Sequence, residues 1–157
     1  MRSILWILFA GVVLTAAGCA QKGGNSAPPP SADAGQAASN ALATLQKLVT
    51  EQNYKTMGFT SLDEVKSAQL AEPLPVFHVA LDRLKSYQGE DPSALLTQSG
   101  ETIYPVTAGG QVRSSVTLVK KDSSYTASSF GNAEVVKTLT RYRTPNTPGA
   151  FVVHIQK

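Results

Sequence analysis

A single cysteine limits how this chain can be held together. Cys19 is the only cysteine among 157 residues, so the fold has no internal disulfide and has to be stabilised by packing. It follows a 12-residue run from Ile4 to Thr15, preceded by one basic residue, Arg2. That run is shorter than the roughly 20 apolar residues of a membrane-spanning helix. With the small residues Ala16 to Gly18, the pattern predicts a secretory signal peptide over residues 1–18.

The segment Leu14-Thr15-Ala16-Ala17-Gly18-Cys19 resembles the lipobox of bacterial lipoproteins. That family usually has leucine three residues before the cysteine, where this chain has Ala16. The resemblance implies cleavage before Cys19, diacylglyceryl transfer to its thiol and often acylation of the new amine. Several acyl chains hold a protein stably in a bilayer, so we expect a lipid anchor at Cys19. The alternative is an ordinary secreted protein with a free thiol.

The resemblance also predicts a location in the cell envelope. Aspartate directly after the cysteine tends to retain such proteins at the inner membrane, and this chain has Ala20 there. We therefore expect the outer membrane where the host has one, on its periplasmic face or its surface. Otherwise we expect the outer face of the cytoplasmic membrane.

The composition after Cys19 predicts a tether followed by one domain. Up to Ser39 the chain is rich in Gly, Ser, Pro and Ala and has no larger apolar residue, a composition typical of disorder. We therefore expect a lipidated cysteine with a disordered tether over residues 19–39. Residues 40–157 remain for a single domain, long enough to bury a core.

The apolar patterns in residues 40–157 predict an α+β domain. We expect a small antiparallel sheet of four to five strands with helices packed on one face. Asn40 is expected to cap a first helix, Ser61 with Glu64 forms a capping-box pattern, and Asp91-Pro92 is typical of a short helix start. Strands are expected over 75–84, 102–106, 111–120, 125–130 and 151–155, and a helix after Gly131-Asn132.

Two sequence features bear on the expected sheet. Gly109-Gly110 is expected to turn the chain between two strands. From Gln111 to Lys120, valine and leucine alternate with Arg113, Ser115 and Thr117, which predicts that one face of the sheet meets solvent.

The sequence predicts no catalytic residue, no metal ligand and no cofactor. His78 and Asp82 are four residues apart, a spacing that brings them together on a helix and separates them on a strand. No Gly-x-Ser-x-Gly motif accompanies them. His154 lies in an apolar strand, and two histidines without a cysteine partner or paired-histidine motif do not indicate zinc.

The basic residues of the second half indicate a candidate anion-binding patch. Residues 102–157 carry seven Lys or Arg against two Asp or Glu. If the helix expected after Gly131-Asn132 packs beside the strand expected over 111–120, their basic residues come together: Arg113, Lys137, Arg141 and Arg143. The alternative is structural: Arg141 and Arg143 complement a helix C-terminus, and the lysines near the turn protect a sheet edge.

These features favour a non-enzymatic binding or scaffolding module anchored in the envelope, with an unidentified ligand. The membrane is the expected partner through the N-terminal lipid; an envelope protein, an anionic glycan or a lipid headgroup is expected at the domain, and no nucleic acid. Two alternatives stay open: an envelope hydrolase using His78 or His154, and a small-ligand carrier.

The anchor is directly testable. We predict that Cys19→Ala abolishes incorporation of labelled fatty acid and releases the protein from the membrane fraction, because the substitution removes the acylated thiol. Incorporation is measured by labelling in cells followed by fractionation. Label uptake unchanged by the substitution would refute the anchor.

Overall fold

The structure is a computed structural model that describes residues 32–142 and 149–156. Cys19, the predicted signal peptide and Arg143 lie outside the described residues. The helices are α1 (Ala32–Leu48), α2 (Leu62–Lys66), α3 (Leu81–Lys85), η1 (Pro92–Leu95, a 3-10 helix) and α4 (Ala133–Arg141). The strands are β1 (Gln69–Leu70), β2 (Leu74–Ala80), β3 (Thr97–Ala108), β4 (Gln111–Lys121), β5 (Ser124–Phe130) and β6 (Val152–Gln156).

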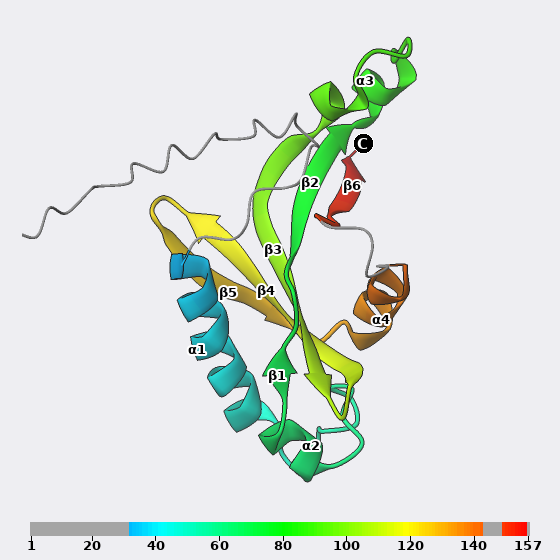
Figure 1. The fold of residues 1–157 in the computed structure, drawn as a ribbon. Helices are drawn as coiled ribbons and strands as arrows, with labels where there is room; N and C mark the ends of the chain where they lie inside the picture. The colour runs from blue at the N-terminus through cyan, green and yellow to red at the C-terminus, as the bar shows by residue number, and fades with distance from the viewer. Residues whose placement is uncertain (1–31, 143–148, 157) are drawn as a thin grey trace, which may run out of the picture.

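The strands form one mixed sheet in the order β5-β4-β3-β2-β6, with β1 also pairing to β3. All pairs are antiparallel except β2 with β6, which run parallel. Figure 1 shows the upper parts of β2 and β3 projecting as a long arm with α3 at its tip. The predicted α+β class is confirmed, with six strands where four to five were predicted. The prediction of a purely antiparallel sheet is wrong, because β6 joins β2 in parallel.

The main core lies between α1 and one face of β3 and β4. Ala38, Ala41 and Leu45 are at most 5% exposed and pack against a strand cluster of Tyr104, Val106, Val116 and Leu118. Figure 1 shows α1 lying lengthwise beside β4 and β5. The predicted helix start at Asn40 is wrong, because α1 begins at Ala32. Residues 32–39, which we assigned to the tether, belong to this helix since Ala34 and Ala38 are buried on it.

The opposite face of β4 is covered by α4. Ser115 points away from α1 and was predicted to meet solvent, yet it is 1% exposed. Its hydroxyl donates to the carbonyl oxygen of Gly131, whose amide donates to the Ser115 carbonyl at 3.0 Å. Val136 of α4 is equally buried. Helices therefore pack on both faces of the sheet, and the prediction of one covered face is wrong.

Local chemistry explains the short elements. The Ser61 hydroxyl accepts the Glu64 amide at 3.2 Å, and the Asp91 carboxylate accepts the Ser93 amide at 2.9 Å, which confirms both predicted caps. Both glycines of the predicted turn, Gly109-Gly110, have positive φ. The strand predicted over 75–84 is confirmed as far as Ala80, but the next five residues form α3.

Gly58 lies against the backbone of β4. It has a φ of +94°, and a Cβ atom there would lie 1.8 Å from the Arg113 carbonyl oxygen and 2.8 Å from the Ala133 Cβ. β5 pairs with β4 only from Val116 onward, so it does not reach Arg113. Gly58 lets the connection between α1 and α2 lie directly against β4 at that point. Any side chain at this position would separate the two segments.

We predict that Gly58→Ala destabilises the domain by at least about 2 kcal/mol more than Gly131→Ala, because overpacking adds to backbone strain. Gly131 is the matched control, since its φ is +104° and a Cβ there meets no atom within 4 Å. The free energies of unfolding are measured by urea titration with far-UV circular dichroism. Equal losses of stability would contradict the close approach.

Candidate functional site

One end of the sheet is formed by β6. It pairs with β2 in unbroken parallel register, from Val76 opposite Val152 to Ala80 opposite Gln156. No strand in the described part of the chain pairs with the other side of β6. An edge strand carries a row of backbone N–H and C=O groups with which a further strand can pair. The other end strand, β5, likewise has no further described strand on its outer side, and it contacts α1.

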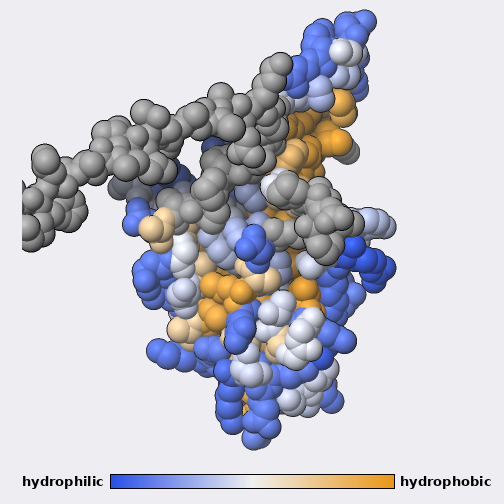
Figure 2. Space-filling model, in the orientation of Figure 1, coloured by the Kyte–Doolittle hydropathy of each residue, from blue (hydrophilic) through white to orange (hydrophobic). Residues whose placement is uncertain are grey.

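Apolar side chains cover one face of this edge. Phe151, Val153 and Ile155 alternate along the chain and are 38%, 43% and 51% exposed. The ring of Phe151 meets that of Phe77 edge to face, with centroids 5.1 Å apart. We call Phe77, Phe151, Val153 and Ile155 the apolar ridge. Figure 2 shows hydrophobic residues gathered over the region of β2 and β6, beside the hydrophilic end that carries α3.

The two histidines meet on the opposite face of the same edge. His78 lies directly opposite His154 in the β2–β6 register, and the ring centroids are 5.5 Å apart at an angle of 75°. The Gln156 side-chain nitrogen lies 2.9 Å from Nδ1 of His78. His154 is exposed and His78 is partly buried. The sequence alone did not indicate that these two histidines are neighbours.

A shared local pattern was the available signal for this pair. Val76-Phe77-His78-Val79 and Val152-Val153-His154-Ile155 both place a histidine third among apolar residues. Two such strands paired in register bring their histidines together. The pattern alone does not state that the strands are neighbours, which is why the pairing was missed. Asp82 falls in α3, outside the strand that holds His78.

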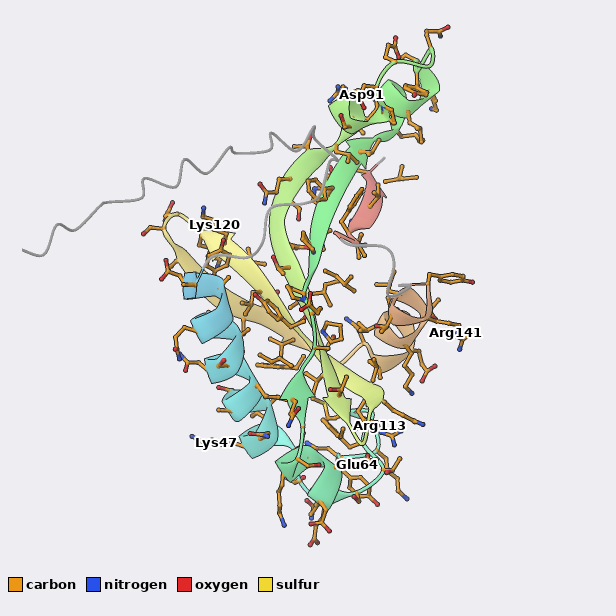
Figure 3. The ribbon with its side chains drawn as sticks, viewed as in Figure 1. Lys47, Glu64, Asp91, Arg113, Lys120 and Arg141 are labelled. Carbon is orange, nitrogen blue, oxygen red and sulfur yellow. The ribbon has the colours of Figure 1, made fainter. Side chains whose placement is uncertain are left out.

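The predicted anion-binding residues are not assembled as four free cations. Arg113 contacts Glu64 at 2.6 Å, and both side chains are less than 20% exposed. Lys137 contacts Glu134 of its own helix at 2.8 Å. Arg141 is exposed at the end of α4, and Arg143 lies outside the described residues. In Figure 3 the labelled Arg113 and Glu64 lie together near α2, away from Arg141 on α4.

Glu64 is a structural carboxylate. One oxygen accepts the Thr60 amide at 2.7 Å and the other accepts from the Arg113 guanidinium. These contacts, the Thr60 amide foremost, hold the pKa of Glu64 below its ordinary value against the opposing effect of desolvation. Arg113 therefore joins β4 to α2 through its ion pair with Glu64. This pairing reduces the ability of Arg113 to bind an external anion.

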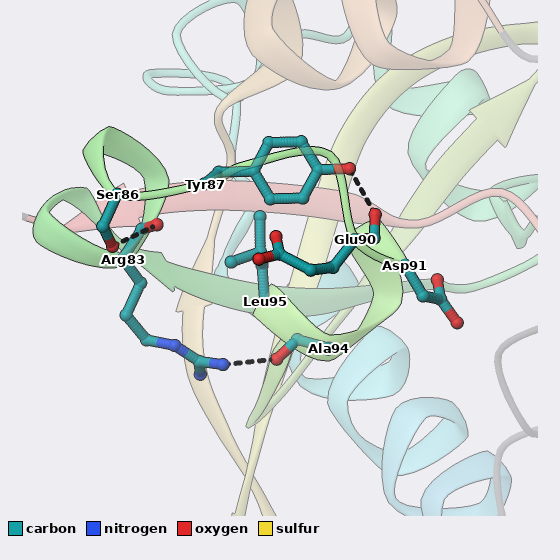
Figure 4. A pocket seen from close by; sticks show the side chains of 7 residues that line it. All are labelled: Arg83, Ser86, Tyr87, Glu90, Asp91, Ala94 and Leu95. Carbon is teal, nitrogen blue, oxygen red and sulfur yellow. Dashed lines mark hydrogen bonds between the residues drawn. The ribbon is translucent and has the colours of Figure 1, made fainter.

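A hollow of about 240 Å³ lies at the tip of the arm, between α3 and η1. Figure 4 shows that its walls are joined to each other: Arg83 donates to the Ala94 carbonyl oxygen at 2.6 Å, and the Tyr87 hydroxyl donates to the Glu90 carbonyl oxygen. Ligand pockets are usually about 300–1,000 Å³ and mostly apolar. The hollow is smaller and its walls are largely exposed, so it adds no support to a small-ligand carrier.

Comparison with known proteins does not extend these observations. No protein-family model, curated protein or solved structure matches the chain. Within residues 32–142 and 149–156, no helix has the length and apolar character needed to cross a membrane. The same residues contain no group of three or more His, Cys, Asp or Glu side chains placed to hold a metal ion.

The Glu64–Arg113 pair predicts how stability depends on acid. Arg113→Met is expected to cost about 1.5–3 kcal/mol, since it removes a hydrogen bond between charged groups and leaves Glu64 partly buried. The lowered pKa means that the unfolded chain binds the Glu64 proton more readily. The stability that ionised Glu64 contributes is therefore complete above the ordinary glutamate pKa, and it is lost as pH falls through the pKa of Glu64 in the folded state.

Unfolding free energies of the wild type and Glu64→Gln, measured between pH 7 and pH 3, test this dependence. The variant is expected to be less stable at neutral pH and to lose less stability on acidification. Asp63→Asn is the control, because the neighbouring Asp63–Lys66 pair is solvent-exposed and such pairs contribute about 0–1 kcal/mol. Parallel pH profiles for wild type and Glu64→Gln would contradict the assignment.

Proposed function

We propose that this protein is a lipid-anchored, non-enzymatic binding module of the bacterial cell envelope, and that it binds an extended segment of a partner protein along the free edge of β6. The observation that carries the proposal is an exposed edge strand that pairs, among the described strands, only with β2 and has an apolar ridge on one face. The lipobox-like segment ending at Cys19 supports the envelope location.

The chemistry of β6 is unusual for an edge that only meets water. Natural sheets blunt their edges with lysine, proline or bulges, or cover them. Val152–Gln156 contains no charged residue and no proline, and its pairing with β2 has no register shift. A partner segment adding as a seventh strand would gain main-chain hydrogen bonds from the edge and side-chain contacts from the ridge.

The ridge favours a protein segment over the other expected partners. An anionic glycan or a lipid headgroup requires free positive charge, and Arg113 and Lys137 are already paired with carboxylates. Val153 and Ile155 instead offer branched apolar surface at alternate positions of one strand. That spacing matches the alternation of side chains along a strand lying beside them.

Site-specific photocrosslinking in cells tests this edge. We expect a crosslinker at Ile155 to give one discrete adduct with an envelope protein, and a crosslinker at Val135 to give none. Val135 is the matched control because it is also an exposed aliphatic residue, 58% against 51%, and lies on α4. The adducts are identified by mass spectrometry.

The contacts of the ridge are tested by a charge substitution. Val153→Lys with the crosslinker kept at Ile155 is expected to weaken capture about tenfold or more, because burying an apolar side chain contributes about 1.5–3 kcal/mol and 1.4 kcal/mol is a factor of ten. The same crosslinks at Val135 and Ile155, or capture unaffected by Val153→Lys, would overturn the proposed surface.

A further inference from the structure

The fold places His78 and His154 side by side in neighbouring strands. Residues directly opposite in adjacent strands project from the same face of a sheet, so both imidazoles leave neighbouring strands on one side. The chain contains only these two histidines, and the fold brings both to one point across 76 residues of sequence. The ring centroids are 5.5 Å apart, and the 75° angle turns the edge of one ring toward the other.

We propose that His78 and His154 form a binding site for one divalent transition-metal ion. Two imidazole nitrogens at about 2.0–2.1 Å from a tetrahedral ion are about 3.3 Å apart. The rings meet edge to face, so side-chain rotation is needed to turn one nitrogen of each ring toward a common ion. Adjacent strands are about 4.7–4.9 Å apart, which keeps both imidazoles within reach of such an ion. The proposal goes beyond the docking function and does not rest on it.

Gln156 is positioned to select the ligating nitrogen of His78. Its amide lies 2.9 Å from Nδ1, and the nitrogen and oxygen of an amide exchange places by rotation about the last side-chain bond. With the oxygen turned toward the ring, Gln156 accepts the Nδ1–H and leaves Nε2 unprotonated for the metal. Metal-bound histidines almost always donate their second N–H to such an acceptor. Gln156 is thus a positioning residue.

The ligand set determines the class of metal. Imidazole suits copper, nickel and zinc, whereas calcium and magnesium take oxygen ligands. No group of three His, Cys, Asp or Glu side chains gathers in the described residues, so water completes the coordination. The order of affinities for nitrogen ligands places Cu²⁺ above Ni²⁺ and Zn²⁺.

Binding at this place would also fix β6 in the sheet. Among the described strands, β6 pairs only with β2. An ion held by one histidine from each strand joins them by bonds additional to the backbone ladder. Metal binding is therefore expected to slow amide hydrogen exchange in β6 and leave β4 unchanged.

The test uses the full chain in detergent, with Cys19→Ser to remove the thiol ligand and without a histidine tag. Calorimetric titration with Cu²⁺ and with Ni²⁺ is expected to give one ion per chain, and the Cu²⁺ spin resonance spectrum to show two nitrogen ligands. His78→Ala and His154→Ala are each expected to weaken binding about a hundredfold, because the chelate becomes a single contact. Gln156→Ala is expected to weaken it about tenfold.

Thr97→Ala is the control, because Thr97 flanks His78 from β3 and is not part of the pair. It is expected to leave the affinity unchanged. Circular dichroism of each variant establishes that the fold is retained, and exchange in β6 gives a readout independent of affinity. Absence of stoichiometric binding to the wild type, affinity unchanged in His154→Ala, or metal-independent exchange in β6 would each overturn the site.

Discussion

Close packing of small side chains between α1 and the sheet is the constraint on which the domain depends. Without a disulfide, the fold relies on Ala38, Ala41 and Leu45 lying against the inward face of β3 and β4. Alanine combines the highest helix propensity with a side chain short enough to let a helix approach a sheet closely. The Glu64–Arg113 pair and Gly58 then bring the connection after α1 onto β4. The far end of the sheet, where β2 meets β6, is left free of that packing.

The sequence indicated the features that depend on neighbouring residues. Ser61 and Asp91 cap helices through contacts within three residues, so their chemistry is visible in the sequence itself. The helical role of Ala34 was missed because alanine becomes a core residue only when another surface lies close to it. Ser115 was assigned to solvent because its alternation is that of a polar face, and the covering helix comes from a later part of the chain.

The candidate site was the least predictable part for the same reason. Each histidine was recognised, but the sheet order that brings β2 beside β6 is set by packing between segments far apart in the chain. Conversely, the candidate anion patch joined Arg113 to Lys137 by placing a helix beside a strand. The structure does place α4 on β4, yet Arg113 is paired with Glu64 and Lys137 with Glu134. Charge counts do not reveal such internal neutralisation.

The parallel pairing of β2 with β6 has a consequence for the order of folding. The β3–β4 and β4–β5 pairs are hairpins with local contacts, whereas β2 and β6 are joined across 76 residues. Closing so long a loop is slower than forming hairpins, so the meander is expected to assemble first. Before β6 pairs with β2, β2 is the edge strand and Phe151 does not cover the ring of Phe77. Before β6 pairs, the partly folded chain therefore exposes the seven-residue strand β2 at its edge in place of the five-residue strand β6.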